Sequence, residues 1–129
     1  MNILLDTHIA LWAITNDPKL PEHAHKTLLS PRTRLYVSVA SLWEIGIKHR
    51  KNPKNMPIPA VEAQDYFEQS GFELLSIRAH HVLEESNLTD IHKDPFDRIL
   101  IAQAISEPMY LMTHDANILQ YPKVLTIEA

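Results

Sequence analysis

Short apolar runs alternate with longer amphipathic stretches along this chain. The apolar runs predict β-strands at Asn2–Leu5, Leu35–Val39, Glu73–Ile77, Met109–Thr113 and Val124–Ile127. Between them, hydrophobic residues recur about every 3.6 positions, which is typical of α-helices that bury one face. Helices are predicted over Thr7–Ile14, Pro21–Leu29, Ser41–Arg50, Ala60–Ser70, Ala79–Ser86 and Asp94–Ile105, with a short helix after Asp115. This alternation predicts an α/β fold in which helices cover both faces of a parallel sheet.

The chain shows no internal repeat and no long linker, and its 129 residues favour a single domain over 1–129. Gly71 stands where the helix before the third strand should end. Gly46 and Gly71 are the only glycines, so the sequence cannot form the glycine-rich phosphate loop of P-loop NTPases or dinucleotide-binding folds.

Composition narrows the picture further. Hydrophobic residues make up 45% of the chain, and there is no cysteine, which suits a reducing compartment. The apolar start is interrupted by Asp6 and His8 and is not preceded by a basic region, so it does not resemble a signal peptide. No apolar run reaches the roughly 18 residues of a membrane span. We therefore expect a cytoplasmic protein without a membrane partner.

Four acidic residues stand at the junctions between predicted strands and helices. Asp6, Glu44 and Asp115 come shortly after strands, and Asp97 lies at the start of a helix. Each could serve only its helix, since acids near a helix start cap free N–H groups and complement the helix dipole. Ser41 and Glu44 also have the spacing of a capping box. Asp94, followed by Pro95, is fully explained as an N-cap.

Taken together, the four acids point to a shared site. The carboxyl ends of parallel strands meet at one edge of the sheet, where ligands of open α/β folds bind. Carboxylates gathered there would repel one another unless a divalent cation lay between them. Mg²⁺ prefers oxygen ligands, and two such ions could activate water and stabilise the leaving oxygen of a phosphodiester. The net charge of −4 does not exclude this, because four metal-bound acids would leave the rest near neutral.

Four segments carry a family resemblance: LLDTHIALWA, SLWEIGIK, DPFDRILIAQA and LMTHD. Together, in this order and spacing, they resemble the PIN-domain ribonucleases, in particular the VapC-type toxins of bacterial toxin–antitoxin pairs. The resemblance runs from residue 2 to about residue 127. It implies a five-stranded parallel sheet in the order 3-2-1-4-5. It also implies Mg²⁺- or Mn²⁺-dependent endonucleolytic cleavage of RNA.

The resemblance also assigns roles to residues. Asp6, Glu44 and Asp97 match the core metal-binding and catalytic acids of the family. Asp115 matches the fourth acid, and Thr113 matches a hydroxyl beside it. The resemblance further implies a cognate antitoxin and a homodimer. Trp12, Trp43, Leu28 and Leu29 are candidates for the antitoxin surface, although both tryptophans are better explained as packing residues.

Substrate contacts are less well defined. Lys48, within the basic stretch KHRKNPK, could attract phosphate or could simply complement the negative end of its helix. Arg98 could contact the scissile phosphate or a neighbouring acid. His114 could contact substrate. The eight histidines are not spaced as a zinc site.

Other functions fit less well. A phospho-acceptor receiver domain needs an aspartate after its third strand, where this chain reads LLSIRAH. A nuclease for structured DNA would need room for an arch that threads a strand. A non-catalytic PIN-like module that binds RNA or protein remains the main alternative, although a degenerate site should have lost one of the four acids.

Overall fold

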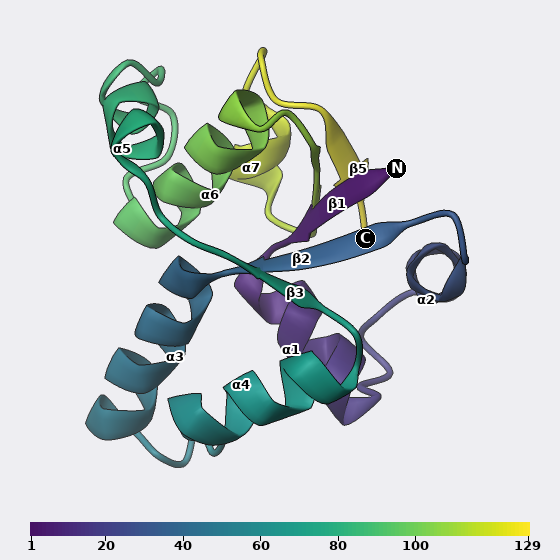
Figure 1. The fold of residues 1–129 in the computed structure, drawn as a ribbon. Coiled ribbons are helices and arrows are strands. Elements are labelled where there is room, and N and C mark those ends of the chain that lie inside the picture. Colours follow the sequence, from purple (N-terminus) through teal and green to yellow (C-terminus); the bar gives the residue numbers. More distant parts are fainter.

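The computed structural model describes residues 1–129 as alternating strands and helices (Figure 1). The strands are β1 (Asn2–Leu5), β2 (Arg34–Ser38), β3 (Glu73–Leu75), β4 (Tyr110–Thr113) and β5 (Thr126–Glu128). The helices are α1 (Thr7–Thr15), α2 (Glu22–Leu29), α3 (Val39–Lys51), α4 (Ala60–Gln69), α5 (Ala79–Ser86), α6 (Pro95–Ser106) and α7 (Ala116–Leu119). No helix combines the length and apolar character needed to cross a membrane.

The five strands form one parallel sheet in the order β3-β2-β1-β4-β5. The predicted α/β class and strand order are therefore confirmed. Strand β1 lies at the centre, and Leu5, its last residue, pairs with both Val37 of β2 and Met112 of β4. The strand order reverses between β1 and β4, and the loops that follow these two strands diverge there. Such a switch point leaves a crevice at the carboxyl edge of the sheet.

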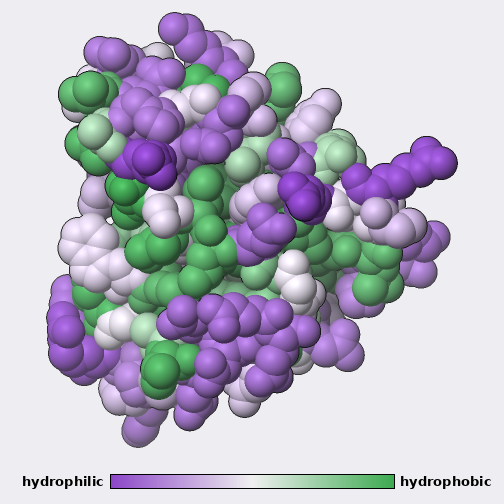
Figure 2. Space-filling view, viewed as in Figure 1, coloured by the Kyte–Doolittle hydropathy of each residue, from purple (hydrophilic) through white to green (hydrophobic).

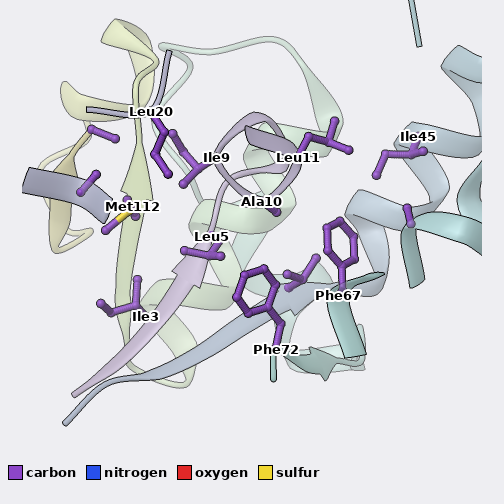
Figure 3. Packing of buried hydrophobic residues seen from close by; sticks show 14 of the residues in the cluster. Ile3, Leu5, Ile9, Ala10, Leu11, Leu20, Ile45, Phe67, Phe72 and Met112 are labelled. Atoms are coloured by element: carbon purple, nitrogen blue, oxygen red, sulfur yellow. The ribbon is translucent and has the colours of Figure 1, made fainter. Parts of the chain in front are cut away.

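Alternate residues of β1 face opposite sides of the sheet, as expected for a buried strand. Ile3 and Leu5 belong to a core beneath α1, α2 and α4. Leu4 belongs to a second core with α6 and α7. Figure 3 shows part of the first core, where the Phe67 and Phe72 rings lie to the right of Leu5. The two helical layers lie on opposite sides of the sheet in Figure 1, with α1 and α4 on one side and α5–α7 on the other.

Helix α3 begins earlier than the sequence pattern predicts. Val39, predicted as the last residue of the second strand, is the first residue of α3, because the Ser38 side chain accepts the Ala40 N–H at 3.0 Å and caps the helix. Ser41, the predicted cap, lies inside the helix. Because α3 directly follows β2, Glu44 lies about one turn further into the helix than the third helical position, which the Glu of a capping box occupies.

Candidate active site

One surface pocket gathers residues that follow β1 and β4 with residues from α1, α3 and α6. Its volume is about 370 Å³. The pocket is lined by Asp6, His8, Trp12, Glu44, Lys48, His92, Asp94, Asp97, His114 and Asp115. The four acids singled out in the sequence thus share one pocket beside the switch point of the sheet.

Asp6 directly follows β1 and is only 5% exposed. Its Oδ1 accepts the His8 N–H at 3.3 Å and caps α1, while its Oδ2 accepts the Thr113 hydroxyl at 2.7 Å. Burial raises the pKa of Asp6 above its ordinary value. Hydrogen bonding to Thr113 and the His8 ring oppose that rise, and the negative charge of Glu44 adds to it. The carboxylate is therefore fixed in orientation but poorly solvated, a state that a nearby cation would stabilise.

Glu44 is 2% exposed, and both of its oxygens are engaged. The Thr7 hydroxyl donates to Oε1 at 2.8 Å, and the Lys48 ammonium lies 2.5 Å from Oε2. The Ser41 hydroxyl also forms a hydrogen bond of 2.8 Å with Thr7. The predicted capping box of Ser41 and Glu44 is therefore wrong: both side chains contact Thr7 of α1 rather than the start of their own helix.

Asp94 is the N-cap of α6, as predicted. Its Oδ1 accepts the N–H groups of Phe96 at 2.9 Å and Asp97 at 3.4 Å, and Pro95 occupies the first helical position. The same arrangement places Asp94 on the wall of the pocket. Its charge therefore adds to that of the neighbouring acids even though its oxygen is used for capping.

Asp97 shows how concentrated the negative charge is. Burial raises its pKa from 3.8 to about 7, and the charges of Asp6, Asp94 and Glu44 contribute to the rise, while His92 opposes it. A carboxyl group with this pKa is still partly protonated at neutral pH without a bound cation. The geometry therefore favours a divalent cation as the counterion of these acids.

His92, which the sequence analysis did not single out, connects two of the acids. Its Nε2 lies 2.8 Å from Asp97 Oδ2 and forms a hydrogen bond of 3.3 Å with Asp115 Oδ2. Its Nδ1 accepts the Asp94 N–H at 3.2 Å, so the neutral ring carries its proton on Nε2 and donates it towards the carboxylates. No periodicity or motif in the sequence signals this role, because it depends on the loop before α6 folding back over the pocket.

Thr113, the last residue of β4, and Thr7, the first residue of α1, hold the acids in place. Thr113 is fully buried; its hydroxyl donates to Asp6 and accepts the Asp115 N–H at 3.0 Å. Asp115 then caps α7 by accepting the N–H of Asn117 at 2.8 Å. Thr7 was not predicted, although its position directly after Asp6 in the sequence was an available signal.

The two predicted substrate-binding cations occupy different places. Lys48 lines the pocket; burial favours its neutral form, but the hydrogen bond and charge of Glu44 raise its pKa, so it stays protonated. Arg98 does not line the pocket. Its guanidinium forms an ion pair of 3.1 Å with Glu85 and donates to backbone carbonyls of Thr89 and His92. Of the two predicted contacts of Arg98, the structure therefore shows the one with an acid, and Arg98 also anchors the loop before α6.

The donor set of the pocket suits a hard divalent cation. His92, Asp97 and Asp115 each bring one potential ligand atom within 4.8 Å of the others. With Asp6 and Glu44 in the same pocket, oxygen ligands predominate, as Mg²⁺ and Mn²⁺ prefer. The proton on His92 Nε2 makes this ring a hydrogen-bond donor to the ligands in the present arrangement.

A second cluster, His80, His81 and Glu107, has a different chemistry. His81 is fully buried, its Nδ1 accepts the Arg78 N–H at 2.9 Å, and its Nε2 lies 2.6 Å from Glu107 Oε2. The backbone donor to Nδ1 leaves the proton on Nε2, where it is donated to Glu107. The buried ring therefore has no free lone pair for a metal and instead links α5 to the end of α6.

Comparison with known families decides the identity of the fold. The family model described as PIN domain matches residues 3–124. The chain belongs to the PIN-domain family. The match covers the segments from β1 to the end of the loop after α7, so every acid of the pocket lies within it. No curated protein sequence matches this PIN domain at a significant level.

Solved structures share the fold of this PIN domain over nearly its whole length. A chain of DNA-bound VapBC from Salmonella typhimurium is 17% identical with a TM-score of 0.75, covering 99% of this chain and 98% of that one. VapBC2 from Rickettsia felis, bound to a promoter DNA fragment, is 19% identical with a TM-score of 0.74, and the match covers 99% of this chain and 98% of that one. Mycobacterium tuberculosis VapC20, described as a sarcin-ricin loop cleaving toxin, is 16% identical with a TM-score of 0.61, and the match covers 95% of this chain and 98% of that one. At these identities the likeness establishes the fold.

Proposed function

We propose that this PIN domain is a Mg²⁺- or Mn²⁺-dependent endoribonuclease and the toxin of a toxin–antitoxin pair. The observation that carries the proposal is the meeting of Asp6, Glu44, Asp97 and Asp115 in one pocket, with the pKa of Asp97 raised to about 7 by burial and by its neighbours. Acids arranged in this way are stable together only with a cation or a proton between them. The fold shared with VapC20, described as a sarcin-ricin loop cleaving toxin, supports RNA as the substrate.

The residues divide the task according to their positions. Asp6 and Asp97 would hold the metal most directly, Glu44 would bind it or orient the attacking water, and Asp115 would complete the negative charge. When bound, the metal would supply a Lewis acid that activates water and stabilises the leaving oxygen of the phosphodiester. Water adds across the bond between phosphorus and the 3′ oxygen, leaving a 5′-phosphate and a 3′-hydroxyl.

Two further side chains support substrate binding in this proposal. Lys48 reaches the pocket with a charged ammonium that is 44% exposed, so it can contact a phosphate oxygen without leaving Glu44. Thr113 would act through Asp6, whose orientation it fixes. We assign the activity to the cytoplasm, where its RNA substrates occur.

An antitoxin and a second copy of the chain are the proposed protein partners. Three structures with the same fold are described as VapBC and a fourth as a toxin–antitoxin complex, which supports an antitoxin partner. An apolar groove of about 220 Å³ lies beside the exposed Trp43, between α3, α5 and α6. Figure 2 views the side that contains edge strand β3 and shows hydrophobic residues in a band between the two helical layers. Leu29, 70% exposed on α2, and Trp12 at the pocket are further candidate contacts. Light scattering of the purified chain, alone and with the product of an adjacent gene, tests both partners.

Cleavage of total RNA with Mg²⁺ or Mn²⁺, and with EDTA, tests the enzymatic proposal. Wild type should cut only with the metal, and mapped ends should carry a 5′-phosphate. Asp6→Asn should abolish cleavage and keep the fold, because an asparagine side chain can still cap α1. Asp65→Asn, at an exposed acid on α4, is the matched control and should cut at the wild-type rate.

Cleavage in EDTA, or full activity of Asp6→Asn, would refute the proposal. Calorimetric Mn²⁺ binding by wild type with no cleavage of any RNA would instead favour the non-catalytic module.

A further inference from the structure

One wall of the pocket is aromatic, and the proposed metal chemistry does not use it. The Trp12 ring lies between two histidine rings, with centroid distances of 6.4 Å to His8 and 5.9 Å to His114. His8 and Trp12 come from α1, and His114 follows β4. All three line the same pocket as the four acids.

Two residues of the wall are held in place, and the wall stays accessible. Trp12 packs on one side against the core under α1 and is half-buried, while both histidines are exposed. His114 Nδ1 is 2.8 Å from the Ala129 carbonyl oxygen and donates to it, which fixes the ring against Trp12. Aromatic rings that are already held in place offer contact area to a flat ligand with little loss of side-chain entropy on binding.

The chemistry of the wall restricts its ligand. Tryptophan has no lone pair for a metal, and neither His8 nor His114 belongs to the group of close ligand atoms around Asp97. The five acids of the pocket disfavour a second anion near the wall. These observations disfavour a metal ion and an anion as the ligand of the wall. They favour a planar, uncharged ring system that can stack on indole.

We propose that Trp12, flanked by His8 and His114, stacks against an unpaired base of the RNA next to the cleaved phosphodiester. This inference rests on the proposed endoribonuclease function and narrows its substrate to single-stranded or looped RNA. Bases that leave a helix stack on aromatic side chains, whereas bases within a duplex have their faces covered. Because every base has a π face, the wall favours unpaired RNA without choosing a sequence.

Fluorescence can test this contact directly, because the chain has only two tryptophans. Trp43→Phe leaves Trp12 as the only reporter, and Trp12→Phe leaves Trp43. Each is combined with Asp6→Asn, which should block cleavage, and is titrated, with Mg²⁺ present, with RNA eight-mers of mixed sequence, single-stranded or as a duplex. Single-stranded RNA should quench Trp12, while the duplex should not, and Trp43 should respond to neither. Equal quenching by duplex, or no quenching of Trp12, would overturn the proposal.

Kinetics supply a second readout. Trp12→Leu keeps an apolar contact with the core but removes the stacking surface, and should raise KM for single-stranded RNA roughly 5- to 150-fold with little change in kcat. Trp12→Phe should retain most of the affinity. Tyr66→Leu, at an exposed aromatic residue on α4, is the control and should leave both constants unchanged. Circular dichroism and thermal melting confirm that each variant is folded.

The outcomes separate this proposal from the function on which it rests. RNA cleavage by wild type with an unchanged KM in Trp12→Leu would refute stacking but leave the nuclease intact. Absence of cleavage by wild type would refute the nuclease, and the fluorescence result would then decide the stacking alone. Quenching of Trp12 by a bound antitoxin but not by RNA would assign the wall to the protein partner and overturn the RNA proposal.

Discussion

Asp6 uses its two oxygens for two different purposes. Oδ1 caps α1 through the His8 N–H, and Oδ2 accepts the Thr113 hydroxyl at the pocket. Asp115 does the same, with Oδ1 capping α7 and Oδ2 facing His92. At the residue scale, helix capping and membership of the site are therefore compatible. Treating them as alternatives, as sequence reasoning does, understates how much one carboxylate can do.

Thr113 provides a test of positioning at this scale. Thr113→Val keeps the shape but loses the hydroxyl that holds Asp6 Oδ2 and accepts the Asp115 N–H. Loss of such a supporting contact typically reduces metal affinity or activity roughly 10- to 100-fold. We expect a decrease of this size in Mn²⁺ affinity by calorimetry and in RNA cleavage. Thr113→Ser keeps the hydroxyl and should retain most of both; a Ser variant as impaired as Val would assign the effect to packing.

The end of α4 shows how local sequence determines an element. Gly71 adopts φ +83°, its N–H donates to the Glu68 carbonyl, and the Phe72 N–H donates to the Phe67 carbonyl. This is the Schellman motif, in which a hydrophobic contact accompanies the turn. Here the Phe67 and Phe72 rings supply it, with centroids 6.1 Å apart in the core shown in Figure 3.

The two glycines of the chain should respond to alanine with opposite signs. At Gly71 a Cβ would meet nothing within 4 Å, so Gly71→Ala isolates the backbone strain of the left-handed conformation and should destabilise the fold by about 1 kcal/mol. At Gly46, inside α3, the new Cβ would lie 3.5 Å from the Ala60 Cβ, an ordinary contact. Gly46→Ala should therefore stabilise by up to about 1 kcal/mol through helix propensity. Urea unfolding measures both, and destabilisation by Gly46→Ala would show that α3 and α4 cannot accommodate the extra methyl.

At the scale of the whole molecule, the pocket brings together acidic side chains from segments that are distant in the sequence. Its acids come from the end of β1, from α3, from α6 and from the loop after β4, so their repulsion opposes folding of the entire domain. Asp97, with a pKa of about 7 in the fold against 3.8 ordinarily, binds more protons when folded than when unfolded between these values. Stability from this group therefore decreases as pH rises from about 4 to about 7 and then levels off.

Thermal melting in EDTA and with Mn²⁺ tests this coupling. In EDTA, the melting temperature of wild type should fall from pH 6 to pH 8 relative to that of Asp97→Asn, which lacks the titrating group. Mn²⁺ should reverse the loss at pH 8, by about 2.7 kcal/mol when its concentration is 100 times Kd. Asp97→Asn should gain much less from the metal. Parallel pH profiles for the two proteins, or an equal metal effect on both, would contradict the electrostatic account.

The sequence by itself determined the order and nature of the elements and the membership of most of the site. Apolar runs, the caps Asp6 and Asp94 and the stop at Gly71 act through neighbours within a few residues, so they can be read in one dimension. The family resemblance added the strand order, which no local pattern in the sequence determines. Boundaries such as the start of α3 at Ser38 differed, because two serines three residues apart are equally good caps until the strand length is known.

Only the tertiary structure decided how the side chains of the pocket share their contacts. His92 and Thr7 reach acids that lie far along the chain or on another helix, and Arg98 turns away to Glu85. The meeting of Trp12 with His114 likewise depends on β1 and β4 being neighbours in the sheet. These pairings depend on distances between segments that no local pattern encodes. The sequence specifies which groups are present, and the packing of the sheet and helices specifies which of them interact.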